Sequence, residues 1–323
     1  MIRPHFAARF VALSVPLLLV ACGAAPASSG PAPDAAPAAL TAEETARLFD
    51  YDASAPLDVQ TVTTQKRQGY TLQELTYASP KGGRVPALLM VPEGPGPFAG
   101  ILLLHGAPGT YERVIPEGEV LVRRGAVILA INAPFSRGSR LGNPMEMLHF
   151  DERDRDDQVQ LAVDLRRGVD LLLSRPDVDK DRLAFSGRSF GGSQGGLLAG
   201  VEKRIKAYAL VVGDGGPVHH FTGEEISNNP LRYLPPEQVK RWKAIMEPIE
   251  PIRWVGRAAP AHLLFQNGRQ DTLVPPSNSR AYQEAGSEPK TVLWYDAGHQ
   301  LDEQATRDRH VWLAERIGIA PPQ

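Results

Sequence analysis

The chain has 323 residues, of which 42% are hydrophobic and 22% charged, a balance typical of globular proteins that excludes a wholly disordered chain. Its 35 Lys and Arg residues stand against 37 Asp and Glu residues, so no basic excess points to a nucleic-acid partner. The single cysteine excludes an intramolecular disulfide framework and a cysteine-rich zinc site.

The first 22 residues have the layout of an export signal. Arg3 and Arg9 form a positively charged start before an apolar run at 11–20, which is too short to cross a membrane but typical of a signal-peptide core. The run ends in the letters LVAC, with Cys22 last, and this ending resembles the lipobox of bacterial lipoproteins. The resemblance implies cleavage before Cys22 and attachment of lipid to its sulfur. An ordinary secretory signal is the alternative.

The segment after Cys22 has the composition of a linker. Residues 23–39 are Ala, Pro, Ser and Gly apart from Asp34, and such a segment cannot bury a core. No aspartate follows Cys22 directly, which in Gram-negative lipoproteins implies the outer membrane, so we expect a lipid-anchored protein of the bacterial cell envelope. The expected domains are a signal peptide over residues 1–21, a tether over 22–39 and a folded domain over 40–323.

From about residue 40, apolar runs typical of strands alternate with helical patterns, which favours a mostly parallel sheet covered by helices. The run FAGILLL at 98–104 is apolar throughout, as in strands buried on both faces. Residues 71–77 and 84–91 predict a hairpin around a Gly-rich turn. Eight strands are expected: 71–77, 84–91, 98–104, 126–131, 182–186, 207–212, 262–265 and 291–295.

Two long segments between the strands are predicted to be helical, over 154–174 and 214–258. Apolar residues recur at helical spacing over 154–174, and Pro176 ends that helix. The charged residues 151–157 at its start are expected to face solvent. Prolines interrupt residues 214–258, which we expect to form helical turns over the sheet edge and to cap a pocket. The pocket-lining candidates are Arg137, Arg140, His149 and Trp242, although exposed loop positions are the ordinary interpretation for each.

The strand at 182–186 leads into the letters GRSFG, a GxSxG pattern centred on Ser189. A small-residue helix over 191–199 follows, and this strand–turn–helix order predicts a nucleophile elbow, in which the serine lies on a strained turn. Side chains two positions before or after the serine would clash there, and Gly187 and Gly191 meet that need. A Gly-rich phosphate-binding turn is the alternative, but the GxxxxGK[ST] pattern is absent.

The loop after the expected strand at 98–104 carries the next part of the motif. The His105-Gly106-Ala107 segment lies where a second oxyanion donor is usual, so the N–H groups of Phe190 and Ala107 are the predicted pair. His105 itself is expected to be structural, because Pro and Gly residues mark this segment as a shaped loop.

Asp271 follows the seventh strand, just before a Val-Pro pair, and His299 follows the last strand in a Gly-His turn. Ser189, Asp271 and His299 therefore stand in the chain order of an α/β-hydrolase triad. Asp214, which follows the sixth strand, is the reserve acid. Adjacent histidines such as His219 and His220 rarely chelate one ion and no HExxH pattern is present, so we predict no metal and no cofactor.

On these motifs the chain resembles the α/β-hydrolase superfamily, and it is most similar to the dienelactone-hydrolase-like and prolyl-oligopeptidase-like branches. The helix segment at 164–172, the Ser189 elbow and the Pro-Ile-Arg-x-Val segment at 251–255 carry the similarity, which covers about residues 60–318. Dienelactone hydrolases proper use cysteine where this chain has Ser189. That departure favours ester or amide hydrolysis over the lactone reaction.

The resemblance implies a serine hydrolase that cleaves small-molecule carboxylic esters. Ser189 would attack the acyl carbon, His299 would act as general base, and Asp271 would orient the imidazole. A serine peptidase of the acylaminoacyl or dipeptidyl kind is one alternative, but no N-terminal propeller fits between the tether and the first strand. A non-catalytic binding lipoprotein on a hydrolase scaffold is the other, and an intact triad argues against it.

Overall fold

The computed structural model describes residues 40–138, 147–223, 226 and 229–322. The predicted signal peptide, the lipid-attachment residue Cys22, the tether and Arg140 lie outside these residues. Within the described ranges, no helix is long and apolar enough to span a membrane. No cluster of metal-ligating side chains occurs in them either.

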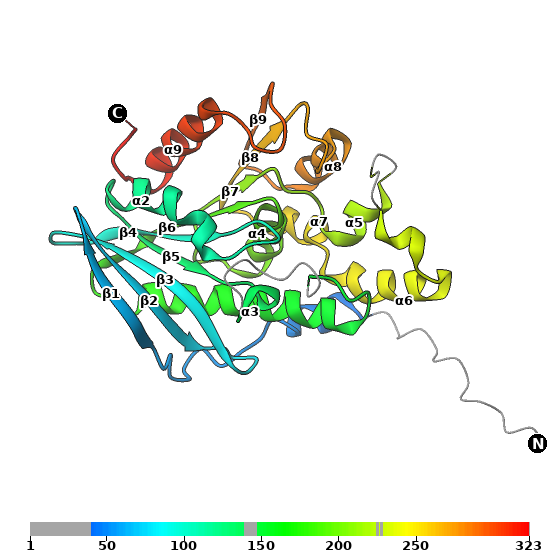
Figure 1. Ribbon diagram of the computed structural model, residues 1–323, viewed down its shortest axis with the longest axis horizontal. Coiled ribbons are helices and arrows are strands. Elements are labelled where there is room, and N and C mark those ends of the chain that lie inside the picture. The colour runs from blue at the N-terminus through cyan, green and yellow to red at the C-terminus, as the bar shows by residue number, and fades with distance from the viewer. Residues whose placement is uncertain (1–39, 139–146, 224–225, 227–228, 323) are drawn as a thin grey trace, which may run out of the picture. The chain divides into compact units, whose positions relative to one another are not determined.

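A nine-stranded sheet forms the centre of the described domain (Figure 1), in the order β1-β2-β3-β5-β4-β6-β7-β8-β9. β1 to β3 pair antiparallel, as does β3 with β5, and the remaining neighbours pair parallel. The mostly parallel sheet and the hairpin of β2 with β3 are confirmed. The strands are β1 (Gln60–Arg67), β2 (Tyr70–Ala78), β3 (Arg84–Pro92), β4 (Phe98–Leu104), β5 (Ala126–Ile131), β6 (Val178–Arg188), β7 (Ala207–Val211), β8 (His262–Gly268) and β9 (Lys290–Tyr295).

The expected number of eight strands is wrong, because β1 is an additional edge strand. All of its residues are exposed, and it pairs with β2 alone. Its letters QTVTTQKR carry no run of apolar residues, since neither face of the strand packs on a core. Backbone hydrogen bonds to β2 hold it, and those bonds leave no hydrophobic pattern in a sequence.

Helices cover both faces of the sheet (Figure 1). α2 and α9 contribute apolar side chains to the core on one face, while α3, α4 and α8 contribute to the core on the other. The helix predicted over 154–174 is confirmed as α3. The helices are α1 (Ala42–Arg47), α2 (Ile115–Val122), α3 (Glu152–Leu173), α4 (Phe190–Val201), α5 (Pro217–Thr222), α6 (Pro236–Met246), α7 (Pro251–Trp254), α8 (Pro276–Ala285) and α9 (Glu303–Ile317).

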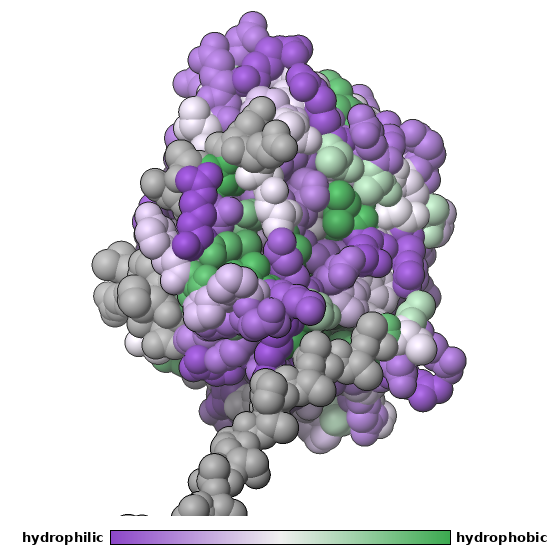
Figure 2. Space-filling view, turned by 90° about the vertical axis from the view of Figure 1, so that its right-hand side faces the viewer, coloured by the Kyte–Doolittle hydropathy of each residue, from purple (hydrophilic) through white to green (hydrophobic). Residues whose placement is uncertain are grey.

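The described part of residues 214–258 contains the helices α5, α6 and α7, joined by loops and short 3₁₀ turns, which agrees with the helical turns expected there. Figure 2 shows the side of the molecule on which α5 and α6 lie, where hydrophobic surface emerges between hydrophilic residues. α7 packs closely on α4. A Cβ on Gly200 of α4 would lie only 2.8 Å from the Cβ of Trp254 in α7, so this contact requires a glycine. The indole of Trp254 in turn meets the ring of Phe49 edge-on, with 5.3 Å between centroids.

The start of α3 differs from the expected solvated face, because Asp154 is only 2% exposed. Its carboxylate accepts hydrogen bonds from the backbone N–H groups of His149 and Phe150 and from Nε1 of Trp242, the last at 2.7 Å. Three donors satisfy the buried carboxylate. Trp242 is fully buried, so its expected place in an exposed loop is wrong as well.

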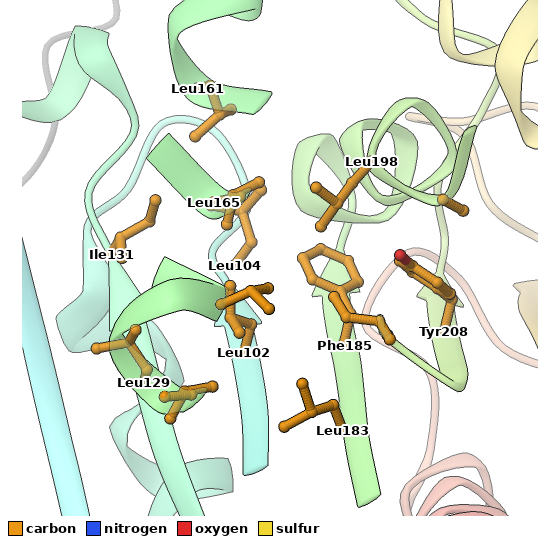
Figure 3. Close-up of a cluster of buried hydrophobic side chains, with 14 of the residues drawn as sticks. Leu102, Leu104, Leu129, Ile131, Leu161, Leu165, Leu183, Phe185, Leu198 and Tyr208 are labelled. Carbon is orange, nitrogen blue, oxygen red and sulfur yellow. The ribbon is translucent and has the colours of Figure 1, made fainter. Parts of the chain in front are cut away.

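The core between the sheet and α3 and α4 is built from leucine and aromatic side chains (Figure 3). Leu161 and Leu165 of α3 lie over β4 and β5, while Leu198 of α4 lies over Phe185 and Tyr208. Burying a leucine-sized side chain stabilises the fold by roughly 2 kcal/mol, so these helices are held on the sheet by their apolar stripes.

Replacing Leu102, which is fully buried in this core, tests the packing. Leu102→Ala is expected to lower the free energy of unfolding by about 3 kcal/mol, because it removes three buried carbons and leaves a cavity. The matched control Val62→Ala alters a β1 side chain that is 65% exposed, and a shift within about 0.5 kcal/mol is expected. Urea denaturation measures both, and equal losses would contradict the assigned core.

Candidate active site

Ser189 lies in a sharp turn between β6 and α4. Its backbone has φ 55° and ψ −118°, a conformation that costs a non-glycine residue roughly 1–3 kcal/mol. The Ser189 N–H donates to the carbonyl of Val211 at the end of β7, at 2.8 Å, and its carbonyl accepts from Ser193 in α4. The neighbouring strand and the helix thus hold the strained serine between them.

Two glycines make this turn possible. A Cβ on Gly187 would overlap the carbonyl of Gly191, and a Cβ on Gly191 would overlap the carbonyls of Leu104 and His105. Both positions therefore exclude every side chain, which is the steric demand that the GxSxG pattern predicts.

The loop after β4 lies against the serine. A Cβ on Gly106 would be 3.3 Å from the Cβ of Ser189 and 4.0 Å from its Oγ. Phe190 is the first residue of α4, so its N–H is one of the donors that a helix start leaves without an intrahelical partner. The predicted oxyanion donors, the N–H groups of Phe190 and Ala107, belong to residues that line one pocket with Ser189.

His105 is a structural member of this loop. It is fully buried, its Nδ1 donates to the carbonyl of Gly106 at 2.7 Å, and its Nε2 accepts from the N–H of Ala133 at 3.2 Å. Burial lowers the pKa of His105 to about 4. The neutral ring therefore fixes the position of the loop.

Asp271 and His299, predicted from separate strand ends, lie together. Nδ1 of His299 donates to Oδ2 of Asp271 at 2.8 Å, while Oδ1 of Asp271 accepts the N–H groups of Leu273 and Val274, each at 2.9 Å. The side chain of Asp271 is 2% exposed. It is thus held from both sides and fixes the tautomer of the imidazole.

Arg188 joins the turn of Ser189 to the loop that carries His299. Its guanidinium donates to the backbone carbonyl of His299 and to Oε1 of Gln300. The His299 loop and the Asp271 loop are joined in turn by the N–H of Gln270, which donates to the carbonyl of Ala297 at 3.0 Å. The segments that carry Ser189, Asp271 and His299 therefore form one connected unit.

The reserve acid Asp214 does not pair with His299. Its Oδ2 accepts from Nδ1 of His220 at 2.6 Å, and its Oδ1 accepts from Oγ of Ser193 at 3.1 Å. Ser193 is the centre of a second GxSxG pattern, residues 191–195, which the sequence reasoning missed. It lies within α4, one turn after the strained serine.

A pocket of about 260 Å³ opens over Ser189, Asp214 and His220, whereas Asp271 and His299 are not among the residues that line it. Its wall is mostly apolar and includes Phe135, Leu161 and Phe221, a composition typical of sites for small organic ligands. The sequence reasoning also missed its polar residues on α3 and α4, since their spacing resembles that of any helix surface. Those residues are Asp154, Asp157, Gln158, Ser193 and Gln194.

The comparisons with known proteins agree with this architecture. No protein-family model matches the chain. Esterase FrsA of Salmonella typhimurium is 24% identical over 273 residues, which cover 76% of this chain but 60% of that protein. An acetyl xylan esterase from Paenibacillus sp. R4 superposes with a TM-score of 0.69 at 22% identity, over 85% of this chain and 93% of the other.

A Klebsiella pneumoniae protein described as a dienelactone hydrolase superposes with a TM-score of 0.54 at 18% identity, over 76% of this chain and 98% of the other. At these identities the solved structures show the fold alone. Together with the mostly parallel sheet, they confirm the α/β-hydrolase fold class that the motifs predict.

His105 provides a pH test of the site. The folded ring has a pKa of about 4 against 6.5 in an unfolded chain, so between pH 6.5 and pH 4 the unfolded state takes up a proton that the folded state refuses. Stability is therefore lost as the pH falls through this window. Glutamine does not titrate, so the variant His105→Gln does not lose stability in this way. The free energy of unfolding of the wild type should therefore approach that of the variant as the pH falls from 7.5 to 4.5.

Urea denaturation at several pH values measures this difference. The other buried histidines are present in both proteins, so their contributions cancel. A difference that stays constant across the whole range would contradict the buried, neutral state of His105.

Proposed function

We propose that this protein is a serine esterase that hydrolyses small-molecule carboxylic esters. The observation that carries the proposal is the Asp271–His299 pair, linked through Arg188 to the strained turn of Ser189. The names of the relatives support the reaction class, since FrsA and the Paenibacillus protein are both called esterases. The chain spans 60% of the length of FrsA. The proposed activity therefore depends on the residues of this chain and not on what FrsA does.

In the proposed mechanism, Ser189 is the nucleophile. Nε2 of His299 takes the proton of the Ser189 hydroxyl as the oxygen attacks the ester carbon, and the charge of Asp271 stabilises the imidazolium that forms. The N–H groups of Phe190 and Ala107 bind the oxyanion of the tetrahedral intermediate, each contributing about 3 kcal/mol. The alcohol leaves with the proton from His299, and a water molecule activated by the same imidazole then hydrolyses the acyl-enzyme.

The apolar wall of the pocket favours an uncharged ester over a peptide. A peptide brings several amide groups that need hydrogen-bond partners in the bound state, whereas eleven of the twenty pocket residues are Ala, Leu, Met, Phe, Pro or Val. A serine peptidase remains the second candidate, on the strength of the nucleophile alone. Parallel assays with p-nitrophenyl acetate and an aminoacyl p-nitroanilide rank the two activities.

The two acidic candidates provide the sharpest test of the triad. Asp271→Asn is expected to lower kcat/KM for p-nitrophenyl acetate by about 10⁴-fold, because the amide no longer fixes the tautomer of His299 or stabilises its charge. Asp214→Asn is expected to lower it by less than tenfold, since Asp214 pairs with His220 instead. A larger loss for Asp214→Asn than for Asp271→Asn would assign the acid to Asp214.

We propose that the full chain is anchored in the bacterial cell envelope, at the outer membrane, by lipid on Cys22. The supporting pattern is the apolar run at 11–20 that ends in LVAC. Acyl chains hold a protein on a bilayer with about 0.8 kcal/mol per buried methylene, and two or more chains give durable attachment. After expression of the full chain in a Gram-negative host, the wild type is expected in the membrane fraction and Cys22→Ala in the soluble fraction. Equal membrane fractions would contradict the anchor.

A further inference from the structure

A second histidine–carboxylate pair faces the pocket of Ser189. His220 and Asp214 both line this pocket, and Nδ1 of His220 lies 2.6 Å from Oδ2 of Asp214. Asp214 is buried, whereas the side chain of His220 is 23% exposed. The pair has no part in the proposed relay from Asp271 to Ser189, so its place in the pocket wall calls for a separate explanation.

The pair is fixed in position by its surroundings. Oδ1 of Asp214 accepts from Oγ of Ser193 and from the N–H of Gly216, and the N–H of Asp214 donates to Oγ of Ser193 at 2.9 Å. α5, which carries His220, is held by the carboxyl of Glu250, which accepts the N–H groups of Val218 and His219. These hydrogen bonds hold both Asp214 and the helix that carries His220, so the position of the imidazole is fixed.

Most other polar groups in the pocket wall already have partners. The carboxylate of Asp154 accepts three hydrogen bonds, and Nε2 of Gln194 donates to Oε1 of Gln158 at 3.0 Å. Asp157 lies where the pocket adjoins a second cavity that Arg137 and His149 also line.

Nε2 of His220 differs from these groups. Nδ1 is bound by Asp214, and among the residues that the structure describes Nε2 has no protein partner. A ligand in the pocket can supply one.

We propose that Nε2 of His220 binds a hydroxyl group of the ester substrate, so that the pocket selects hydroxylated esters over their deoxy counterparts. This proposal rests on the proposed esterase function and names the class of substrate for the same site. Asp214 holds the proton on Nδ1, so a neutral His220 presents Nε2 as an acceptor and a charged His220 presents it as a donor. A hydroxyl group is both donor and acceptor, and it therefore fits either state.

The electrostatic surroundings agree with this role. Burial acts to lower the pKa of His220, but the hydrogen bond and the charge of Asp214 outweigh it and raise the pKa above the ordinary value. The carboxylate thus favours the protonated form of His220. Inside a mostly apolar pocket, a hydrogen bond from this imidazole is stronger than it would be in water. An ester without a hydroxyl would leave Nε2 desolvated and without a partner, which is the source of the discrimination.

Two matched substrate series test the proposal on the full chain. In the acyl series, p-nitrophenyl 3-hydroxybutyrate is compared with p-nitrophenyl butyrate. In the alcohol series, 2-hydroxyethyl phenylacetate is compared with ethyl phenylacetate. The wild type is expected to prefer the hydroxylated ester in one series, and His220→Phe is expected to reduce that ratio of kcat/KM values about tenfold. The series in which the ratio falls identifies the part of the ester that His220 contacts.

Three proteins serve as controls. His220→Gln keeps a hydrogen-bonding amide, so it is expected to retain part of the preference even if the phenylalanine variant folds poorly. Thr222→Ala removes a hydroxyl group from the same helix, where it donates to the carbonyl of Val218. This variant is expected to leave both ratios unchanged. Ser189→Ala establishes that the measured hydrolysis comes from this site.

The outcomes separate the two proposals. Ester hydrolysis that persists in Ser189→Ala, or is absent from the wild type, contradicts the esterase function itself. Hydrolysis that depends on Ser189, with unchanged substrate ratios in His220→Phe and His220→Gln, overturns the assignment of His220 alone. A purely structural role of His220 would lower kcat/KM for hydroxylated and deoxy esters by the same factor.

Discussion

The close approach of three backbone segments around Ser189 is the constraint on which the rest of the site depends. The turn from β6 into α4 passes so near the carbonyls of Leu104 and His105 that no Cβ fits at Gly191. This contact holds the serine in a conformation that an unconstrained chain avoids, with φ 55°. It also places the start of α4 beside the loop after β4, so nucleophile and predicted oxyanion donors are positioned by one packing contact.

Two histidine–carboxylate pairs stand at neighbouring strand ends, and only the pair of Asp214 and His220 lines the pocket. Asp271 follows β8 and pairs with His299, while Asp214 follows β7 and pairs with His220. The contacts of the two pairs differ: Arg188 joins the His299 loop to the elbow, whereas Ser193 and α5 hold the other pair. That difference is the physical basis for assigning the relay to one pair and substrate recognition to the other.

The sequence predicts features that leave a local pattern. Eight strands, α3 and the glycines around Ser189 follow from hydrophobic runs and from a steric rule, and all of these are present in the structure. Features that depend on contacts between distant segments are not predictable in this way. The exposed edge strand β1 has no apolar pattern, and the burial of Asp154 depends on Trp242, 88 residues further along. The partner of Asp214 could not be read from spacing, since His219, His220 and His299 were all available to Asp214 and Asp271.

The most direct measurement of the central claim is the location of a covalent adduct. After reaction with a fluorophosphonate, digestion and peptide mass spectrometry distinguish the two serines that stand in GxSxG patterns, Ser189 and Ser193. A nucleophile activated at the elbow predicts a phosphonyl group on Ser189, lost in Ser189→Ala and retained in Ser193→Ala. An adduct on Ser193, or a protein that does not react, would contradict the account.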